Sequence, residues 1–226
     1  MEQAARENRE RYRAHVLTRE FQILGKNKEK ATSEVWAETS FVPPTTKEFR
    51  ILSRSGSSRG EGIVRRLLED EVKAAAGGDA PGAITRQNYD FTLLGESAVD
   101  GNSCHVLALK AKREDKRLIN GRAWVDKQTY LVRRMEGQMA RLPSWWLRSV
   151  YVTVVFGPVA GMWMQTGTTA VADVRLVGRH VFTSRAVSLR VSQTEAKDFR
   201  NGDGVRPSVQ RPWRGFGPAM SIDPLR

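Results

Sequence analysis

Few residues in this sequence have the types and spacing that catalysis or metal binding requires. The three histidines, His15, His105 and His180, are far apart and lack the spacing of metal ligands. There is no Gly-x-Ser-x-Gly, no His-Glu-x-x-His and no phosphate-binding loop. Asp126 lies in the small polar stretch 126–129, where an acidic side chain commonly caps backbone amides. We therefore predict a protein that is not an enzyme and that uses no cofactor or metal.

The single cysteine, Cys104, excludes an internal disulfide and a cysteine-rich zinc site. It lies in Cys104-His105-Val106-Leu107, within a run of alternating apolar residues. This setting favours an inert, buried strand thiol over a nucleophile.

The net charge of +12 over 226 residues predicts attraction to polyanions. These include nucleic acid, anionic lipid headgroups and acidic proteins. The aromatic residues lie in apolar runs and are not interleaved with clustered basic residues, and no helix-turn-helix, zinc-finger or RNP pattern is present. The sequence therefore argues against a nucleic acid partner, although a basic nucleic-acid or polyanion-binding module stays open as the alternative function.

No apolar run approaches the ~18 residues of a membrane span, and residues 1–6 have no apolar signal core behind them. Two explanations remain open at this point. The protein stays inside the cell, or the sequence is a mature segment whose export signal has been replaced by a start Met.

Alternating and apolar runs predict a large antiparallel sheet centred on residues 121–177. An Asp-Gly hairpin at Asp100-Gly101 and a tight turn at 126–129 separate neighbouring strands, and Pro43-Pro44 marks a loop or an edge. The expected strands are 15–23, 31–41, 47–53, 89–96, 104–112, 121–125, 130–139, 148–156, 167–177 and 181–191.

One convincing helix interrupts the strands. The stretch Ser58-Arg59-Gly60-Glu61 has the spacing of a capping box, apolar residues follow at helical intervals, and Gly77-Gly78 ends the run. This helix is expected to cover the sheet as permanent core, with a gate over a cavity as the alternative. The charged stretch 2–13 is compatible with a short helix or a frayed arm. We expect one domain over 1–226, with ends at about 1–10 and 195–226 that are extended or partly disordered.

Small residues in neighbouring strands, such as Ala170, Ala172, Ser184 and Ala186, leave room above the sheet for a helix, a ligand or a closely packed loop. Two segments, 142–147 and 161–164, carry tryptophans and methionines that look exposed and suit apolar partners of variable shape. The alternative is that Trp145 and Trp146 turn inward as loop anchors.

Several stretches together resemble the LolA/LolB-like group of periplasmic outer-membrane lipoprotein-sorting proteins. They are the run 89–96 with the hairpin and strand 99–109, the stretch Gly121-Arg122-Ala123-Trp124-Val125-Asp126-Lys127-Gln128-Thr129, the return strand through 133–137, and Gly161-Met162-Trp163-Met164. The resemblance covers roughly residues 89–165. It implies a mainly β (α+β) fold, in which a strongly curved, open antiparallel sheet forms an unclosed barrel with a covering helix on its concave side.

The resemblance also implies a non-catalytic, periplasmic carrier that holds a lipid or a lipoprotein acyl chain in the concave face. An envelope membrane or a protein would be its further partner. Basic residues at the rim, such as Lys110, Lys112, Arg133 and Arg134, would meet an anionic headgroup, with Arg133 and Arg134 as the leading candidates. The expected ligand-binding residues are Trp36, Leu93, Leu109, Trp124, Met135, Trp145, Trp146, Val152, Val154 and Met164.

Overall fold

The computed structural model describes residues 1–25, 31–77 and 82–192. It contains two helices and ten strands in these residues. The elements are α1 (Glu2–Glu10), β1 (His15–Leu24), β2 (Ala31–Val42), β3 (Thr46–Gly56), α2 (Ser58–Ala76), β4 (Tyr89–Val99), β5 (Asn102–Ala111), β6 (Ile119–Asp126), β7 (Val132–Met139), β8 (Leu147–Val159), β9 (Met162–Val174) and β10 (Gly178–Val191).

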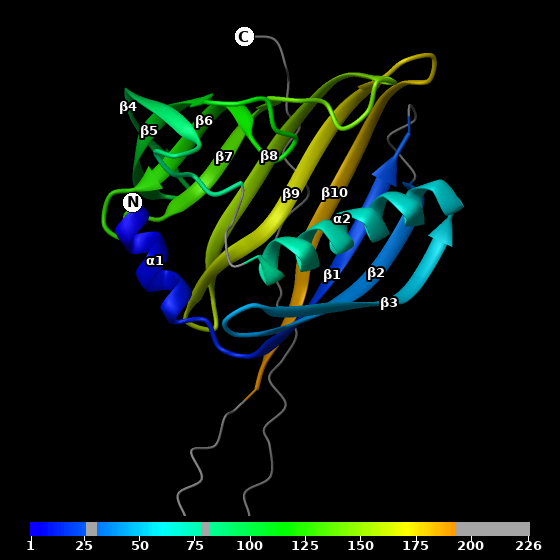
Figure 1. The fold of residues 1–226 in the computed structure, drawn as a ribbon, viewed down its shortest axis with the longest axis horizontal. Coiled ribbons are helices and arrows are strands. Elements are labelled where there is room, and N and C mark those ends of the chain that lie inside the picture. Colours follow the sequence, from blue (N-terminus) through cyan, green and yellow to red (C-terminus); the bar gives the residue numbers. More distant parts are fainter. Residues whose placement is uncertain (26–30, 78–81, 193–226) are drawn as a thin grey trace, which may run out of the picture. The chain divides into compact units, whose positions relative to one another are not determined.

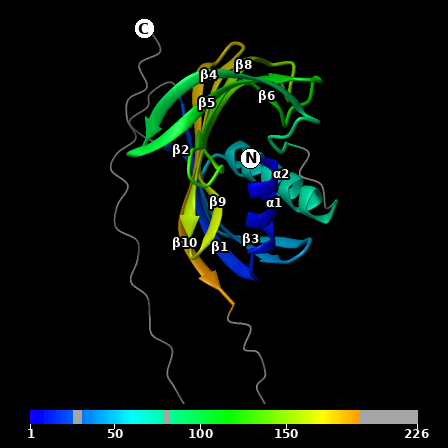
Figure 2. The same ribbon diagram turned by 90° about the vertical axis from the view of Figure 1, so that its left-hand side faces the viewer.

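All ten strands form one antiparallel sheet in the order β3-β2-β1-β10-β9-β8-β7-β6-β5-β4. The end strands β3 and β4 do not pair with each other, so the sheet stays open. Figure 2 shows the sheet bending around the helices. The predicted mainly β fold with a curved, open antiparallel sheet is confirmed.

The predicted turns lie where local chemistry placed them. Asp100 and Gly101 have φ values of 48° and 77°, the left-handed pair that a two-residue hairpin between β4 and β5 requires. The helix cap was predicted one residue late. Ser57, and not Ser58, is the N-cap of α2, and its side chain accepts a hydrogen bond from the Gly60 amide. The two adjacent serines cannot be told apart by pattern alone.

The helix α2 covers one face of the β1–β3 end of the sheet (Figure 1). Val64 and Leu68 of α2 are buried against Phe21, Val35 and Ala37 of β1 and β2. This packing supports the interpretation of α2 as permanent core. We call the face beneath α2 the concave face.

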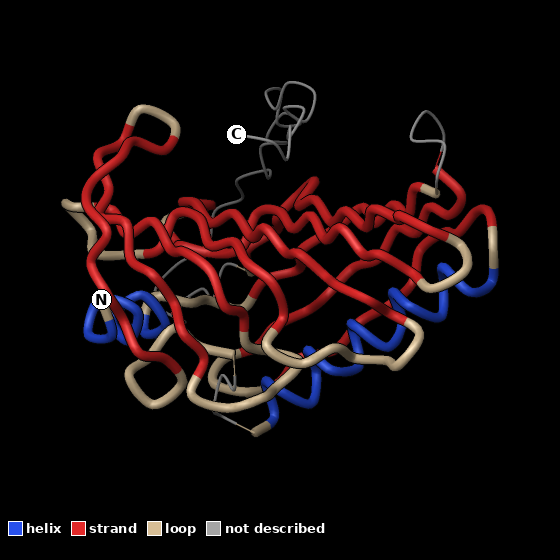
Figure 3. Tube along the Cα trace, turned by 90° about the horizontal axis from the view of Figure 1, so that it is seen from above, coloured by secondary structure: helices blue, strands red, loops and turns tan. Residues whose placement is uncertain are grey.

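A second helix, α1, forms in the charged stretch 2–13, for which the sequence allowed either a short helix or a frayed arm. It lies on the same side of the sheet as α2 (Figure 3). The Asn8 side chain donates to the Trp163 carbonyl (2.7 Å) and accepts from the Trp163 amide (2.9 Å), while the Tyr12 hydroxyl donates to the same carbonyl (2.8 Å). These bonds attach α1 to the start of β9. The predicted extended end at 195–226 lies outside the described residues.

Gly121 and Gly137 are cross-strand partners on β6 and β7. A Cβ atom at Gly121 would lie 2.0 Å from the Glu136 carbonyl oxygen, and one at Gly137 would lie 2.3 Å from the Asn120 carbonyl oxygen. Only glycine permits this close approach of the two backbones. Neither described helix has the length and apolar character needed to cross a bilayer.

Candidate ligand-binding face

Cross-strand partners share a face of the sheet, so the register defines the concave face residue by residue. One row crosses from Phe21, which packs under α2, to the far edge strand. It consists of Val35, Phe21, Ser184, Thr168, Val154, Met135, Ala123, Leu107 and Leu93. Three predicted ligand-binding residues, Leu93, Met135 and Val154, therefore lie on the concave face.

The next row on the same face contains two more of the predicted residues, Leu109 and Val152. It consists of Ile23, Phe182, Ala170, Val152, Gly137, Gly121 and Leu109. The middle of this row has small side chains at Ala170, Gly137 and Gly121. Of the small residues noted in the sequence, Ala170 and Ser184 lie on the concave face, whereas Gly167 lies on the opposite face.

The concave face carries two separate cores. One lies under α2, and the other gathers Tyr89, Leu109, Leu118, Ile119 and Ala123 near the β4–β6 end. Between the two cores, Val152, Thr168 and Ala170 are only half-buried by the described residues. The described side chains therefore leave this part of the concave face partly exposed.

A hollow of about 620 Å³ opens beside the second core, where the N-terminus of α1 meets β4 and β5. Its lining residues on the concave face are Tyr89, which is buried, and Phe91 and Leu107, which are half-buried. Its other lining residues are Met1, Glu2, Arg86, Asp90 and Lys112. The hollow is open to solvent, and polar and apolar atoms contribute about equally to its lining.

We call the charged lining residues the rim, and local contacts hold them. Lys112 donates to the Arg86 carbonyl (2.8 Å) and lies 3.3 Å from a carboxylate oxygen of Asp90. Glu2 accepts a hydrogen bond from the Arg86 amide (2.6 Å), which joins α1 to this rim. Because Lys112 and Asp90 are both exposed, their ion pair is weak and can exchange for a ligand charge.

Three residues of the predicted site lie on the opposite face. Trp36, Trp124 and Arg134 belong to one row of cross-strand partners whose other members are Glu20, Arg185, Gly167, Val155 and Val106. The Arg134 guanidinium lies 5.2 Å from the centre of the Trp124 ring and also pairs with Glu136. The apolar alternation of β6 and β2 did not show which face each tryptophan takes.

None of the ten predicted ligand-binding residues is among those that line the hollow. Trp145 and Trp146 are in the loop before β8, and Trp145 is 84% exposed, so the inward alternative does not hold for it. Met162 and Met164, expected to be exposed, are instead buried in β9. The Arg13 amide donates to the Met162 sulfur, because the chain after α1 crosses this strand.

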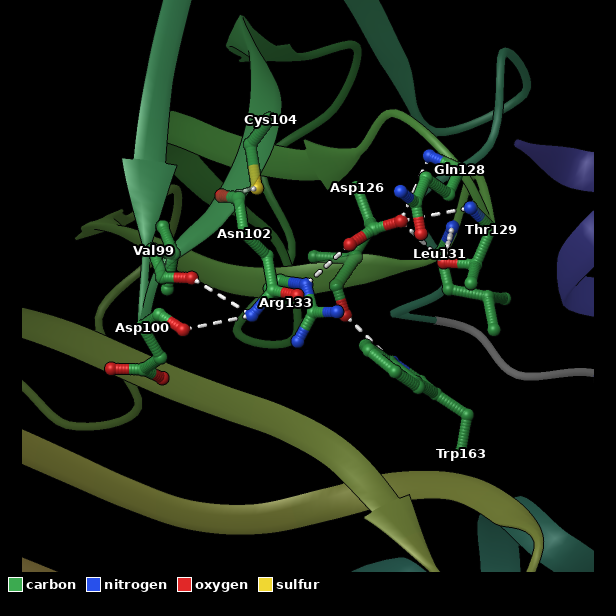
Figure 4. A network of polar contacts seen from close by, with 11 residues as sticks. Val99, Asp100, Asn102, Cys104, Asp126, Gln128, Thr129, Leu131, Arg133 and Trp163 are labelled. Atoms are coloured by element: carbon green, nitrogen blue, oxygen red, sulfur yellow. Dashed lines mark hydrogen bonds and ion pairs between the residues drawn. The ribbon is translucent and has the colours of Figure 1, made fainter.

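The second headgroup candidate, Arg133, belongs to a structural network (Figure 4). The carboxylate of Asp126 accepts from the Gln128 and Thr129 amides (2.9 and 2.8 Å) and from the Arg133 side chain, which also stacks 4.9 Å from the Trp163 ring. Burial raises the pKa of Asp126, but the hydrogen bonds from Thr129, Arg133 and Gln128 outweigh it and hold that pKa below its usual range. The predicted structural role of Asp126 as a turn cap is confirmed.

The candidates for chemistry are scattered. His15, at one end of β1, and His180, near the start of β10, lie on different strands from His105 of β5. Cys104 is buried as predicted, and burial raises the pKa of its thiol. In the part of the chain that the structure describes, no three His, Cys, Asp or Glu side chains gather as a metal site.

Sequence reasoning missed the lining residues Tyr89, Phe91 and Leu107, and the rim residues Glu2 and Arg86. The strand alternation of 89–96 and 104–112 carried a signal for the first three. No sequence pattern indicated Glu2 and Arg86, because the contact between them depends on where α1 packs.

No protein-family model and no curated protein matches this sequence. The chain is similar to solved structures of the LolA superfamily. A LolA superfamily protein from Nitrosomonas europaea is 13% identical, with coverage of 88% of this chain and 97% of that one and a TM-score of 0.40.

Two further structures are similar. An outer membrane lipoprotein-sorting protein domain from Vibrio parahaemolyticus is 15% identical over 87% of this chain and 93% of its own, with a TM-score of 0.43. A DUF1329 family protein from Desulfovibrio piger is 16% identical over 85% and 92%, with a TM-score of 0.39.

Proposed function

We propose that this protein is a non-catalytic carrier that binds a lipid, or the acyl chain of a lipoprotein, on the concave face of its sheet. The observation that carries the proposal is the hollow of about 620 Å³ with Tyr89, Phe91 and Leu107 in its lining. The half-buried strip at Val152, Thr168 and Ala170 extends the apolar surface towards α2.

Burial of apolar surface supplies the binding energy. Each Å² of hydrocarbon removed from water contributes about 25 cal/mol, so an acyl chain that lies along these side chains needs no directional bonds. The small side chain of Ala170, which is half-buried, leaves room for a ligand above the strip.

The rim supplies the polar end of the site. Lys112 and Arg86 also line the hollow, where they can pair with the anionic headgroup of a lipid. Asp90 lies beside Lys112, and Glu2 is bound to the backbone amide of Arg86. Residues Leu93, Leu109, Met135, Val152 and Val154 stay in the proposed binding face, whereas Trp36, Trp124 and Arg134 fall outside it.

We place this carrier in the periplasm, and release of the cargo would occur by exposure of the ligand without bond chemistry. The proposal is tested by native mass spectrometry of the purified full chain, followed by lipid extraction. Mass adducts that release lipid on extraction are expected, as is saturable binding of a fluorescent fatty-acid probe. A chain that carries no lipid and does not bind the probe would reject the carrier.

A further inference from the structure

Two loops at the ends of the inner strands β7 to β10 form a second surface, which is apolar and basic. Residues 140–146 connect β7 to β8, and residues 175–177 connect β9 to β10, whose turn stands at the upper right in Figure 1. Leu147 pairs with Val174, and Arg175 donates from its amide to the Trp146 carbonyl (2.8 Å) and from its side chain to the Trp145 carbonyl (3.0 Å). These bonds hold the two loops together. We call residues 140–148 and 174–179 the tryptophan edge.

Large apolar side chains project from the tryptophan edge. Trp145 is 84% exposed, Leu176 is fully exposed, and Trp146 and Val177 are exposed by 41% and 57%. Leu176 also has a φ of 72°, in the left-handed region that a leucine rarely adopts. A cluster of this kind on a soluble surface is typical of a site that meets an apolar partner.

Positive charge surrounds the apolar group. Arg141, Arg148, Arg175 and Arg179 are exposed, and within the described residues none of them forms an ion pair. Residues 140–148 and 174–179 contain no Asp or Glu, and the adjacent Asp173 faces Arg179 across β9 and β10 without an ion pair between the two. The edge therefore carries a net positive charge beside its apolar side chains.

We propose that the tryptophan edge docks on the surface of an anionic lipid bilayer. Tryptophan rings prefer the headgroup level of a membrane, while leucine and valine side chains enter the acyl boundary. Unpaired arginines gain from the negative surface of the bilayer within a Debye length. An acidic protein surface would also satisfy the arginines, and the experiment below separates that outcome from membrane docking.

The proposal is tested with the full chain and vesicles of phosphatidylcholine, alone or with phosphatidylglycerol. We expect co-sedimentation with the anionic vesicles, a decrease of binding in high salt, and a blue shift of tryptophan emission. The double variant Trp145→Ser/Leu176→Ser is expected to weaken vesicle binding by about tenfold or more. Arg148→Gln/Arg179→Gln is expected to weaken it by about fivefold for each arginine removed.

A matched control removes apolar bulk elsewhere. Leu52 of β3 and Tyr130 after β6 are also exposed, at 44% and 54%, and Leu52→Ser/Tyr130→Ser should leave vesicle binding unchanged. Circular dichroism and thermal unfolding check that each variant folds. Absence of binding by the wild-type chain, or equal binding by the edge variant and the control, would overturn the proposal.

Membrane docking and cargo binding are separable in this experiment. The edge variants should bind the fluorescent fatty-acid probe as the wild type does, because none of the edge residues lines the hollow. Absence of probe binding by the wild-type chain, with vesicle binding intact, would count against the carrier alone. Retention of vesicle binding by Trp145→Ser/Leu176→Ser would count only against membrane docking by the tryptophan edge. An acidic protein would then remain as the partner of this surface.

Discussion

Arg19 of β1 donates one hydrogen bond to each carboxylate oxygen of Glu71 on α2, both at 2.8 Å. Lys47 of β3 donates to the same carboxylate at 2.7 Å. Glu71 therefore joins α2 to two strands through charged bonds, in addition to the apolar packing of Val64 and Leu68. This arrangement fixes α2 on the sheet and weighs against its opening as a gate.

Glu71→Gln should destabilise the protein by about 3 kcal/mol at neutral pH. Burial raises the pKa of Glu71, but Arg19 and Lys47 outweigh it and lower that pKa from 4.5 to about 2, a difference of ~3 kcal/mol. Because the folded pKa is depressed, this stability is present above pH 4.5 and is lost as the pH falls towards 2. The measurement is the free energy of unfolding in urea from pH 7 to pH 2.5.

The difference between the wild type and Glu71→Gln is the quantity to follow, since other carboxylates also titrate in this range. It should shrink as the pH falls. Glu48→Gln serves as the control, because Glu48 is exposed on β3 and forms no ion pair among the described residues. A difference that does not depend on pH would show that the carboxylate charge of Glu71 is not what holds α2.

Gly121→Ala should destabilise the sheet by about 1–3 kcal/mol, because the added methyl group would press on the Glu136 carbonyl. Gly62→Ala is the matched control. A Cβ atom at Gly62, on α2, meets no atom within 4 Å, so alanine should stabilise that helix by up to about 1 kcal/mol. Thermal unfolding of both variants gives the comparison, and equal shifts would contradict the close approach of β6 and β7.

The strands and their order along the chain could be predicted because alternation and turn residues are local signals. Asp100-Gly101 predicted its hairpin, and the polar stretch after Val125 predicted the Asp126 cap. The open, curved sheet was predicted from the family resemblance. The position of α1 was not predictable, since its helix is charged throughout and no residue of it is buried.

The site was predicted less completely, because alternation shows that two faces exist but not which one lies inward. We predicted Leu109, Met135 and Trp124 for the concave face. In the structure Leu109 and Met135 lie there, whereas Trp124 lies on the opposite face. Apolar bulk gave the wrong indication at Trp124, whose ring packs against the Arg134 guanidinium on the outer face. A cation–π contact of this kind stabilises an outward tryptophan, and it cannot be predicted from the pattern of hydrophobic residues.

Ser57→Ala should cost about 1–2 kcal/mol, because it removes the side chain that accepts the Gly60 amide at the start of α2. The Ser57 hydroxyl also lies 2.9 Å from the Ser33 hydroxyl, so its loss disturbs a buried contact with β2. Ser58→Ala tests the alternative cap and should change the free energy of unfolding by less than about 0.5 kcal/mol. A larger effect at Ser58 would move the helix start by one residue.

Leu107→Trp should fill the hollow and weaken binding of the fluorescent fatty-acid probe by about tenfold or more, since a bulky ring would occupy its space. Leu107 is half-buried, so the larger side chain can project into the open space with little loss of stability. Leu94→Trp is the control on the facing strand, where Leu94 is exposed at 53% and does not line the hollow. Probe titrations of both variants, with thermal unfolding alongside, measure the effect. Equal probe affinity in the two variants would move the cargo away from the β4–β5 end and towards the half-buried strip at Val152 and Ala170.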